Sequence, residues 1–540
     1  MTMNYPLLIP RILERARLMY PQKEIVTRVG EGAHRYTYRE LAGRVNRLAN
    51  ALSALGVGAG DRVGTFAWNT YRHLEAYFAA PTMGAVLHTI NIRLNPDDLT
   101  YIINHAGDKV LLVDPDLAPI IEALAPGLES VERFIILTDD RELTTSLPAA
   151  LSYEELLARA SDQFIPVELD ENAPAGLCYT SATTGRPKGV MYSHRGLFLH
   201  SMAECMADTL AFSEQDVVMA IVPMFHANCW GIPYSCTMVG ASQVLPGARP
   251  DPPAICRLID QERVTFAAGV PTIWVGVLDY LERSGERYDF SSLRQIISGG
   301  SAVPTSLIQA YRDKLGVNLV QAYGMTEATP LVSVNRRKSN LAHLSPAEQL
   351  ALSGKQGLLV PGLEMKLVDD KGAELAWDGR QRGELLFRGP WIASEYYNDP
   401  RTLDAFIDGW YHSGDIATVD QDGYIQIVDR VKDMVKSGGE WISSVDLESA
   451  IIAHPAVLEA AVIGIPHPTW QERPLACVVP KAEYRGSLDQ AQILDFLRDK
   501  FARWWLPDHV VFLEEIPKTS VGKFDKKALR ERFKDYPPGK

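Results

Sequence analysis

The chain has 540 residues, of which 46% are hydrophobic, and it carries a formal net charge of −13. Its length predicts one large, multi-lobed domain and at least one smaller domain, because single hydrophobic cores stop growing at about 250–300 residues. The negative charge argues against a nucleic-acid groove, since phosphate backbones are bound by concentrated Lys and Arg. Small anions could still bind locally.

The N-terminal segment and the cysteines carry no sign of secretion or of a metal cluster. Residues 1–20 lack the apolar core and the small-residue cleavage site of a signal peptide. No uninterrupted apolar run is long enough to span a membrane. The six cysteines include no CxxC pair. We therefore expect a cytoplasmic protein with reduced, packed thiols.

The first part of the chain predicts helices that alternate with strands. Residues 37–56 combine a capping box, Thr37 and Glu40, with an apolar stripe, which predicts an amphipathic helix. Asn95 precedes a proline and predicts the start of another helix. Short apolar runs predict strands at 62–68, 85–90 and 109–113. This alternation is typical of parallel α/β layers.

The pattern of predicted strands and helices changes twice in the remainder of the chain. Strand-like runs at 216–223, 264–269 and 295–298 continue the alternation. After about Gly354, short alternating strands with Asp-Gly turns predict a β-rich lobe. Beyond 429–439 the pattern is that of a small α+β domain. The predicted fold class is therefore α/β: a large multi-lobed N-terminal region with parallel α/β layers and a β-rich lobe, and a small α+β C-terminal domain.

Residues 179–189, YTSATTGRPKG, are a candidate phosphate-binding segment. Hydroxyls, backbone N–H groups and an ammonium are the groups that a polyphosphate needs. Here they come from Thr180, Ser181, Thr183, Thr184 and Lys188. The spacing is not that of a Walker A loop, which argues against a kinase-type P-loop. The whole string favours phosphate binding over a polar surface turn.

Weaker signals lie further along the chain. The segment YGMTE, from Tyr323 to Glu327, offers partners for adenine, phosphate and magnesium, although alone it is better explained by a buried tyrosine beside a solvated glutamate. Asp415 could accept hydrogen bonds from ribose hydroxyls, but surface turns contain many such aspartates. A basic run precedes paired glycines, and it indicates either a solvated face or a hinge with cations that face phosphate. Its residues are Arg430, Lys432 and Lys436.

Together these segments resemble the adenylate-forming superfamily of acyl-CoA synthetases, firefly-type luciferases and peptide-synthetase adenylation domains. The motifs occur in family order over nearly the whole chain: YTSATTGRPKG, PMFHANCWG, YGMTE, GELLFRGP, YHSGD, DRVKD, KSGGEW and VGK. The resemblance is greatest to bacterial medium- and long-chain fatty acyl-CoA synthetases. It implies an N-terminal adenylation domain, 1–429, and a mobile C-terminal domain, 430–540, with a hinge at 430–433 and ATP bound between them.

The resemblance also implies a role for each matching residue. Thr180 and Glu327 would hold Mg²⁺ and act in catalysis with Lys523, whose ammonium would neutralise charge on the α-phosphate and carboxylate oxygens. ATP and AMP would contact Ser181, Thr183, Thr184, Lys188, His226, Gly300, Tyr323, Gly324, Thr326, Asp415, Arg430 and Lys436. Arg430 and Lys432 would belong to the hinge.

Two tryptophans match positions at the acyl and CoA side of similar enzymes. Trp230 would gate the fatty-acid tunnel, and Trp441 would lie near adenine or the CoA entrance. Alternatives remain, because Trp230 could be plain core and His226 a structural histidine. One departure is Ala182, where the family usually has glycine; an added methyl group near the phosphates predicts at most a modest slowing of adenylation.

The implied reaction is an AMP-forming ligation in which a carboxylate and ATP give an acyl-adenylate and pyrophosphate, and CoA then gives acyl-CoA and AMP. A medium- or long-chain fatty acid is the expected substrate. The alternatives are a short-chain, thioether or aryl acid and, outside enzymes, a nucleotide- or lipid-binding relative without turnover. Lys523, Glu327 and Asp415 argue against the latter. Similar enzymes pair through their N-terminal domains, so we expect a homodimer.

Overall fold

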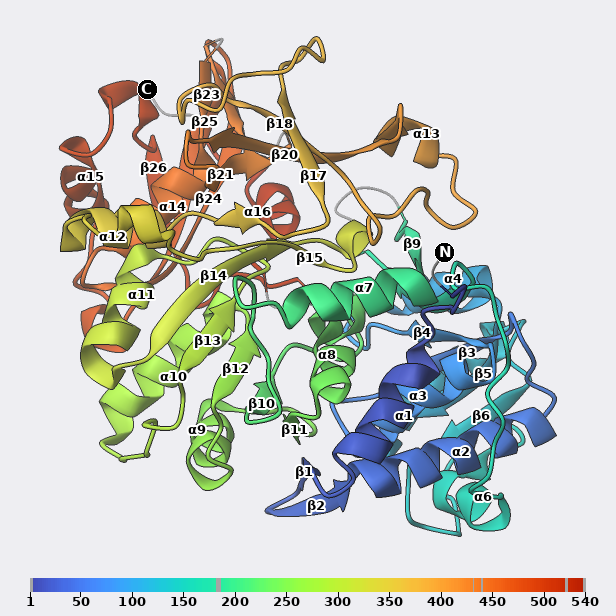
Figure 1. Cartoon of the computed structure of the whole chain (residues 1–540). Coiled ribbons are helices and arrows are strands. Elements are labelled where there is room, and N and C mark those ends of the chain that lie inside the picture. Colours follow the sequence, from blue (N-terminus) through green and yellow to red (C-terminus); the bar gives the residue numbers. More distant parts are fainter. Residues whose placement is uncertain (1–2, 181–185, 431, 439, 520–522, 538–540) are drawn as a thin grey trace.

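A computed structural model describes residues 3–537 of the chain, apart from 181–185, 431, 439 and 520–522 (Figure 1). Over these residues the strands form four sheets. Two sheets are large and mainly parallel, the third is antiparallel, and the fourth lies in the C-terminal part of the chain. This arrangement confirms the predicted α/β fold class with its β-rich lobe and its small C-terminal domain.

The first large sheet contains the strands predicted near the N-terminus. Its strands, in spatial order, are β7 (Leu151–Ser152), β6 (Arg133–Ile136), β5 (Asp108–Val113), β3 (Arg62–Phe66), β4 (Val86–Thr89), β8 (Pro174–Tyr179) and β9 (Gly189–Ser193). All neighbours are parallel except β8 and β9, which form an antiparallel pair. The candidate phosphate-binding segment therefore connects two paired strands at one edge of this sheet.

The second large sheet has more strands than the first, and its central strands are parallel. Its strands, in spatial order, are β16 (Leu358–Leu359), β15 (Leu331–Val334), β14 (Asn318–Gly324), β13 (Gln295–Ser298), β12 (Phe266–Gly269), β10 (Val217–Ala220), β11 (Ser242–Leu245), β1 (Glu24–Val29) and β2 (Gly32–Thr37). The central strands are parallel, so their carboxyl ends share one edge. Ligands of such sheets bind beyond that edge.

The predicted helices begin where their capping residues stand. Thr37 and Glu40 form the predicted capping box of α2 (Tyr38–Ala54). Asn95 accepts a hydrogen bond from the Asp98 N–H at the start of α4 (Pro96–Ala106). Each cap satisfies a backbone donor that the first turn of a helix leaves without a partner.

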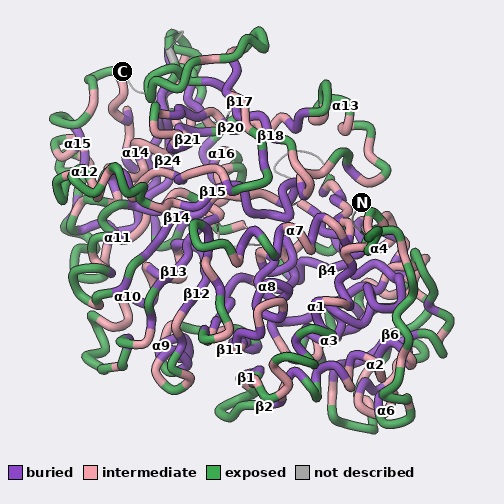
Figure 2. Tube along the Cα trace, in the orientation of Figure 1, coloured by how far each residue is buried: buried purple, intermediate pink, exposed green. Residues whose placement is uncertain are grey.

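Helices cover both faces of the two large sheets. The helices that share one hydrophobic core with both sheets include α1 (Ile9–Met19), α2, α3 (Tyr71–Thr82), α6 (Tyr153–Arg159), α7 (His194–Glu204) and α8 (Ile232–Val239). The outer faces are covered by α4 and α5 (Ala118–Leu124) on the first sheet and by α9 (Pro252–Gln261), α10 (Pro271–Ser284) and α11 (Thr305–Ala310) on the second. Figure 2 shows the buried chain running through the sheets and the exposed chain on the outer helices and loops.

The antiparallel sheet forms the predicted lobe after Gly354. Its strands are β17 (Glu364–Val368), β18 (Gly383–Arg388), β20 (Trp410–Val419), β19 (Phe406–Ile407) and β21 (Ile425–Arg430). Asp415 of β20 pairs in register with Arg430, the last residue of β21. The lobe therefore places the predicted ribose-binding residue beside the start of the predicted hinge.

The C-terminal sheet is a small α+β unit. Its strands are β23 (Glu440–Ile442), β22 (Val435–Ser437), β25 (Gln471–Pro480), β24 (Val457–His467) and β26 (His509–Phe512). Separate hydrophobic clusters pack α14 (Ser444–Ile452) and α15 (Gln490–Arg498) against one set of sheet residues and α16 (Lys526–Arg532) against another. None of the helices in the described parts of the chain has the length and apolarity needed to cross a membrane.

Candidate active site

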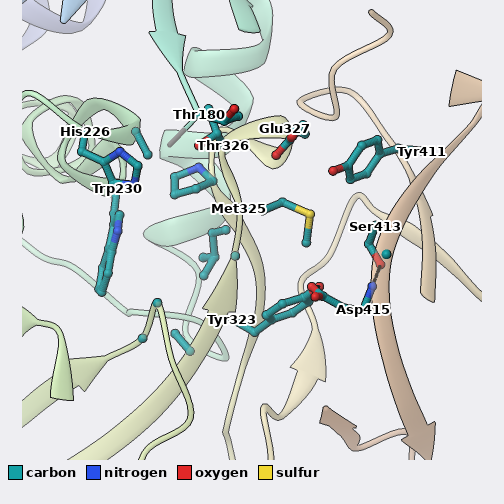
Figure 3. A pocket seen from close by; sticks show the side chains of 18 of the residues that line it. Thr180, His226, Trp230, Tyr323, Met325, Thr326, Glu327, Tyr411, Ser413 and Asp415 are labelled. Carbon is teal, nitrogen blue, oxygen red and sulfur yellow. Dashed lines mark hydrogen bonds between the residues drawn. The ribbon is translucent and has the colours of Figure 1, made fainter. Parts of the chain in front are cut away.

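A cavity of about 680 Å³ brings together most of the candidate residues, which are far apart in the sequence. The candidates that line it are Thr180, Lys188, His226, Trp230, Gly300, Tyr323, Gly324, Thr326, Glu327, Asp415, Arg430, Lys432 and Lys523. Figure 3 shows His226 and Trp230 on one side of this cavity and Ser413 and Asp415 on the other. The cavity thus has two chemically distinct sides.

Five predicted residues are not among the described residues that line this cavity. Ser181, Thr183 and Thr184, together with Ala182, fall outside the described residues. Lys436 and Trp441 are exposed and do not line the cavity. The Lys436 ammonium lies 4.7 Å from the centroid of the Trp441 ring, which is a cation–π contact. The predicted roles of these residues stay predictions.

Asp415 is fixed from two sides at the wall of the cavity. The Tyr323 hydroxyl donates a hydrogen bond to Asp415 Oδ2 at 2.5 Å, and Arg430 Nε lies 3.1 Å from Oδ1. Burial raises the pKa of Tyr323 well above its usual value, with the Asp415 carboxylate adding to the shift, so its hydroxyl remains a donor. This contact links the end of β14 to the antiparallel lobe.

Glu327 and Lys188 meet around a tyrosine that the sequence did not single out. The Tyr396 hydroxyl donates to Glu327 Oε1 at 2.7 Å, and the Lys188 ammonium lies 3.8 Å from the centroid of the Tyr396 ring. The Thr180 N–H donates to the Lys188 carbonyl at 2.9 Å, which closes the base of the loop between β8 and β9. Burial lowers the pKa of Lys188. A carboxylate, an ammonium and a hydroxyl therefore share one end of the cavity.

The oxygens at this end fit a magnesium ion. Mg²⁺ is usually bound by one or two carboxylates together with waters and substrate phosphates. Glu327 supplies such a carboxylate and Thr180 a hydroxyl, and Figure 3 shows both on the same side of the cavity. Within the described ranges no group of three or more His, Cys, Asp or Glu side chains gathers to hold a metal ion. The remaining ligands of an ion would have to come from substrate and water.

The backbone at YGMTE depends on a glycine. A Cβ at Gly324 would lie 2.2 Å from the Pro330 carbonyl oxygen, so a larger residue cannot occupy this position without a shift of the backbone. The same oxygen accepts a hydrogen bond from the Met325 N–H at 2.9 Å. The Tyr192 hydroxyl donates to the Thr326 carbonyl at 2.8 Å. These contacts hold the turn that presents Thr326 and Glu327 to the cavity.

Lys523 reaches the cavity from the C-terminal part of the chain. Gly300 has φ +84°, and a Cβ placed there would lie 3.3 Å from Lys523 Cε and 4.0 Å from Nζ. Burial, with Arg430 as the next contribution, lowers the pKa of Lys523 to about 8. The lysine therefore lies against the carboxyl end of β13, beside the groups expected to bind nucleotide.

The segment PMFHANCWG forms a left-handed turn. Residues 227–230 all have positive φ, between 45° and 57°. This conformation costs about 1–2 kcal/mol for each residue that is not glycine. Asn228 Oδ1 accepts from Cys178 Sγ at 3.1 Å and from Thr89 Oγ1 at 3.3 Å, and these buried contacts hold the turn.

The turn places two candidate side chains in the cavity wall. The Trp230 ring lies against Gly299, where a Cβ would be 3.5 Å from the ring. Burial, with a smaller contribution from Lys523, lowers the pKa of His226 to about 3, so the imidazole is neutral. The apolar part of the cavity lining includes Leu210, Val222, Ile297, Pro330 and Leu331 as well as Trp230.

Sequence reasoning missed several residues of the wall. Tyr396 and Glu204 line the cavity, but neither belongs to a segment that the sequence singled out, and Tyr411, which also lines it, stands in the YHSGD motif but was not named as a candidate. Tyr396 lies in a loop, and Glu204 is the last residue of a helix without a clear apolar stripe, α7. No local signal separates such residues from ordinary core or surface positions.

The chain is similar to known proteins over nearly its whole length. Residues 13–397 match the family described as AMP-binding enzyme, and residues 446–523 match the AMP-binding enzyme C-terminal domain. The chain is 50% identical to a long-chain-fatty-acid–CoA ligase of Thermus thermophilus over 527 residues, 97% of this chain and 95% of that protein. It is 42% identical to a medium-chain-fatty-acid–CoA ligase of Ectopseudomonas oleovorans, over 99% of this chain and 97% of that protein.

A solved structure shares the fold as well. The anthranilate CoA ligase AuaEII in complex with anthranoyl-AMP has a TM-score of 0.87 and 28% sequence identity, with 98% of both chains covered. The match over residues 13–397 and the identity to full-length relatives together show that the chain belongs to the family of AMP-binding enzymes.

Proposed function

We propose that the protein is an ATP-dependent, AMP-forming fatty acyl-CoA ligase that prefers medium- or long-chain acids. The observation that carries the proposal is the cavity in which Lys523 lies over Gly300, because its lining combines the carboxylates of Asp415 and Glu327 with Trp230 and other apolar side chains. The long-chain ligase at 50% identity and the medium-chain ligase at 42% identity support an aliphatic substrate.

The polar side would bind and orient ATP. Asp415, held by Tyr323 and Arg430, would accept hydrogen bonds from the ribose hydroxyls. Lys188 and Thr180 would contact the phosphates. A magnesium ion bound at Thr180 and Glu327 would supply positive charge to the phosphate oxygens. Tyr396 would keep the Glu327 carboxylate in place through its 2.7 Å hydrogen bond.

Lys523 would act on the reacting atoms. Attack of the fatty-acid carboxylate on the α-phosphorus concentrates negative charge on the carboxylate and phosphate oxygens before pyrophosphate leaves. The protonated ammonium of Lys523 would donate hydrogen bonds to these oxygens, and a fixed cation in a water-poor cavity stabilises developing charge more strongly than water does. The acyl-adenylate formed in this way has a good leaving group, AMP, for the following attack by the CoA thiol.

We further propose that the chain rotates about a hinge at 430–433 between the two half-reactions, with domains at 1–429 and 430–540. The ion pairs support this boundary. Arg430 pairs with Asp415 of the antiparallel lobe, whereas Asp433 accepts a hydrogen bond at 2.6 Å from Arg530 of α16. Rotation between these two contacts would withdraw Lys523 and admit the CoA thiol to the same carbonyl.

The wider assignments rest on the same resemblance. We propose a cytoplasmic enzyme that uses Mg²⁺ with ATP and CoA and assembles as a homodimer. Light scattering coupled to gel filtration tests the dimer, and titration of EDTA against Mg²⁺ tests the metal. Loss of pyrophosphate release with EDTA and its recovery with Mg²⁺ would support the assignment.

The substrate class is tested by pyrophosphate release with ATP, Mg²⁺ and CoA over straight-chain acids from short to long, with thioether and aryl acids alongside. A maximum among medium or long chains is the expected result. A maximum on a short, thioether or aryl acid would keep the ligase chemistry and replace the substrate. Tight ATP binding without pyrophosphate release in the presence of any of these acids would contradict the proposal that the protein is a ligase.

A further inference from the structure

A buried carboxyl group stands at the apolar side of the cavity. Glu204 ends α7, is 1% exposed, and lines the same cavity as Trp230 and Leu210. It faces the start of α8, since a Cβ at Gly231 would lie 3.4 Å from Glu204 Oε2. Apolar pockets rarely contain such a group without a partner.

The hydrogen bonds of this carboxyl group leave one oxygen available. The Ser235 hydroxyl donates to Glu204 Oε2 and also lies 3.2 Å from the Gly231 carbonyl oxygen. Glu204 Oε1 lies 3.9 Å from His200 Nε2, which is too far for a hydrogen bond. Considering the described residues only, Oε1 receives no hydrogen bond, although its side chain lines the cavity.

His200 does not neutralise a negative charge here. Its Nε2 accepts a hydrogen bond from the Leu331 N–H at 3.2 Å, which places the ring proton on Nδ1 and leaves Nε2 without a proton to donate to Glu204 Oε1. Burial lowers the pKa of His200 to about 3. Burial also raises the pKa of Glu204 well above its usual value. His200 is therefore uncharged at neutral pH, and burial favours the protonated carboxylic acid form of Glu204.

We propose that Glu204, supported by Ser235, forms a polar subsite at the far side of the acyl pocket that binds a hydroxyl group on the distal part of an aliphatic acid. A hydroxyl both donates and accepts, so it fits Oε1 whichever carboxyl oxygen carries the proton. This inference rests on the proposed ligase function and narrows its substrate class to chain-hydroxylated acids. A terminal methyl group at the same place would leave a buried polar oxygen unpaired, which disfavours the unsubstituted acid.

The test compares matched pairs of acids, each pair being a straight-chain acid and the ω-hydroxy acid of the same chain length, from short to long. The measured quantity is kcat/KM for pyrophosphate release by the full-length enzyme. At the length that reaches Glu204, the hydroxy acid is expected to be preferred about tenfold, the difference that one ordinary hydrogen bond makes.

Substitutions test whether the preference for the hydroxy acid depends on the carboxyl group of Glu204. Glu204→Leu is expected to abolish the hydroxyl preference, whereas Glu204→Gln keeps most of it, because an amide also donates and accepts. Met202, which is exposed on the same helix, supplies the matched control: Met202→Ala leaves the preference unchanged. If Glu204→Leu does not fold, the preference for the hydroxy acid in the unmodified enzyme and in Glu204→Gln still tests the inference.

Two results would overturn the inference. One is preference for the unsubstituted acid at every chain length, and the other is a hydroxyl preference that survives in Glu204→Leu. Either result would leave the proposed ligase function intact. Absence of pyrophosphate release from every acid, hydroxylated or not, would remove the proposed function and the inference together.

Discussion

Lys523 illustrates how a cavity changes the chemistry of a single side chain. Its ammonium is removed from water and lies near Arg430 and Lys432, so burial and like charges lower its pKa to about 8. In solution a lysine ammonium loses its proton near pH 10.4. The lysine is thus mainly a cation at neutral pH, but it loses its charge within the pH range over which enzyme rates can be measured.

The first prediction is a loss of adenylation above about pH 8. In the proposed mechanism the protonated form of Lys523 is the active one, so kcat/KM for ATP in pyrophosphate release is expected to fall as pH rises through about 8, the pKa in the free enzyme. The Lys523→Arg variant, whose guanidinium keeps its charge, should be slower and lack this fall. The fall should persist in Lys432→Gln. A flat profile in the unmodified enzyme from neutral to strongly alkaline pH would contradict the assignment.

Tyr396 provides a second test at the scale of one residue. It donates to Glu327 Oε1 at 2.7 Å and supports the Lys188 ammonium on its ring. Tyr396→Phe keeps the ring and removes the hydroxyl, so the Glu327 carboxylate loses a partner worth about 1.5 kcal/mol or more. We expect kcat/KM for ATP to fall about tenfold.

The neighbouring tyrosine is the control for that change. Tyr397→Phe alters a ring outside the set of described residues that line the cavity, and it should leave ATP kinetics unchanged. Equal effects of the two substitutions on thermal stability, with ATP kinetics unchanged in both, would show that Tyr396 has only a structural role.

At the scale of elements, the left-handed turn at 227–230 is the most unusual feature of the site. Four consecutive residues other than glycine adopt positive φ there. The hydrogen bonds of Asn228 to Cys178 and Thr89 connect the turn to the first large sheet. The turn places Trp230 in the cavity wall.

Asn228→Ala tests this role of the turn. The change removes the acceptor of two buried hydrogen bonds, so the free energy of unfolding should fall by about 1–3 kcal/mol. It should also raise KM for the acid more than KM for ATP, because Trp230 loses its support. Asn46→Ala, which removes an exposed hydrogen bond to the Asp162 carbonyl, should change stability by no more than about 0.5 kcal/mol. A stable variant with unchanged acid kinetics would argue against the role.

Elements with local signals could be predicted from the sequence. Thr37 with Glu40, and Asn95, gave the starts of α2 and α4 because a helix cap depends on residues close in the chain. The strand predicted at 295–298 coincides with β13. The ends of strands could not be predicted in the same way. For example, β10 is shorter than the predicted strand at 216–223, because Val222 and Pro223 belong to the cavity wall.

The residues of the site also fall into two groups, those with a local sequence signal and those without one. Thr180, Lys188 and Glu327 stand in motifs and could be named from the resemblance. Tyr396 and Glu204 could not, because their importance comes from the groups that the fold brings beside them. The pairing of Asp415 with Tyr323 likewise joins residues of different sheets and has no signature in either segment.

At the scale of the whole molecule, one cavity is proposed to serve two reactions by movement of the C-terminal part. The described contacts hold Lys523 inside the cavity, the arrangement suited to adenylation. The C-terminal sheet has its own hydrophobic clusters, so it can move as a unit without exposing them. Arg430 and Asp433, with their separate ion pairs, would mark the chain between the two parts in the proposed movement.

The most direct test of this account measures the two half-reactions of the Lys523→Ala variant separately. Pyrophosphate release from acid and ATP should fall about a hundredfold or more, because a charge-stabilising donor is lost. Thiolation of a supplied acyl-adenylate by CoA should remain close to that of the unmodified enzyme, and Lys527→Ala, at an exposed lysine of α16, should impair neither step. Loss of both half-reactions in Lys523→Ala, or adenylation at an unchanged rate, would contradict the account.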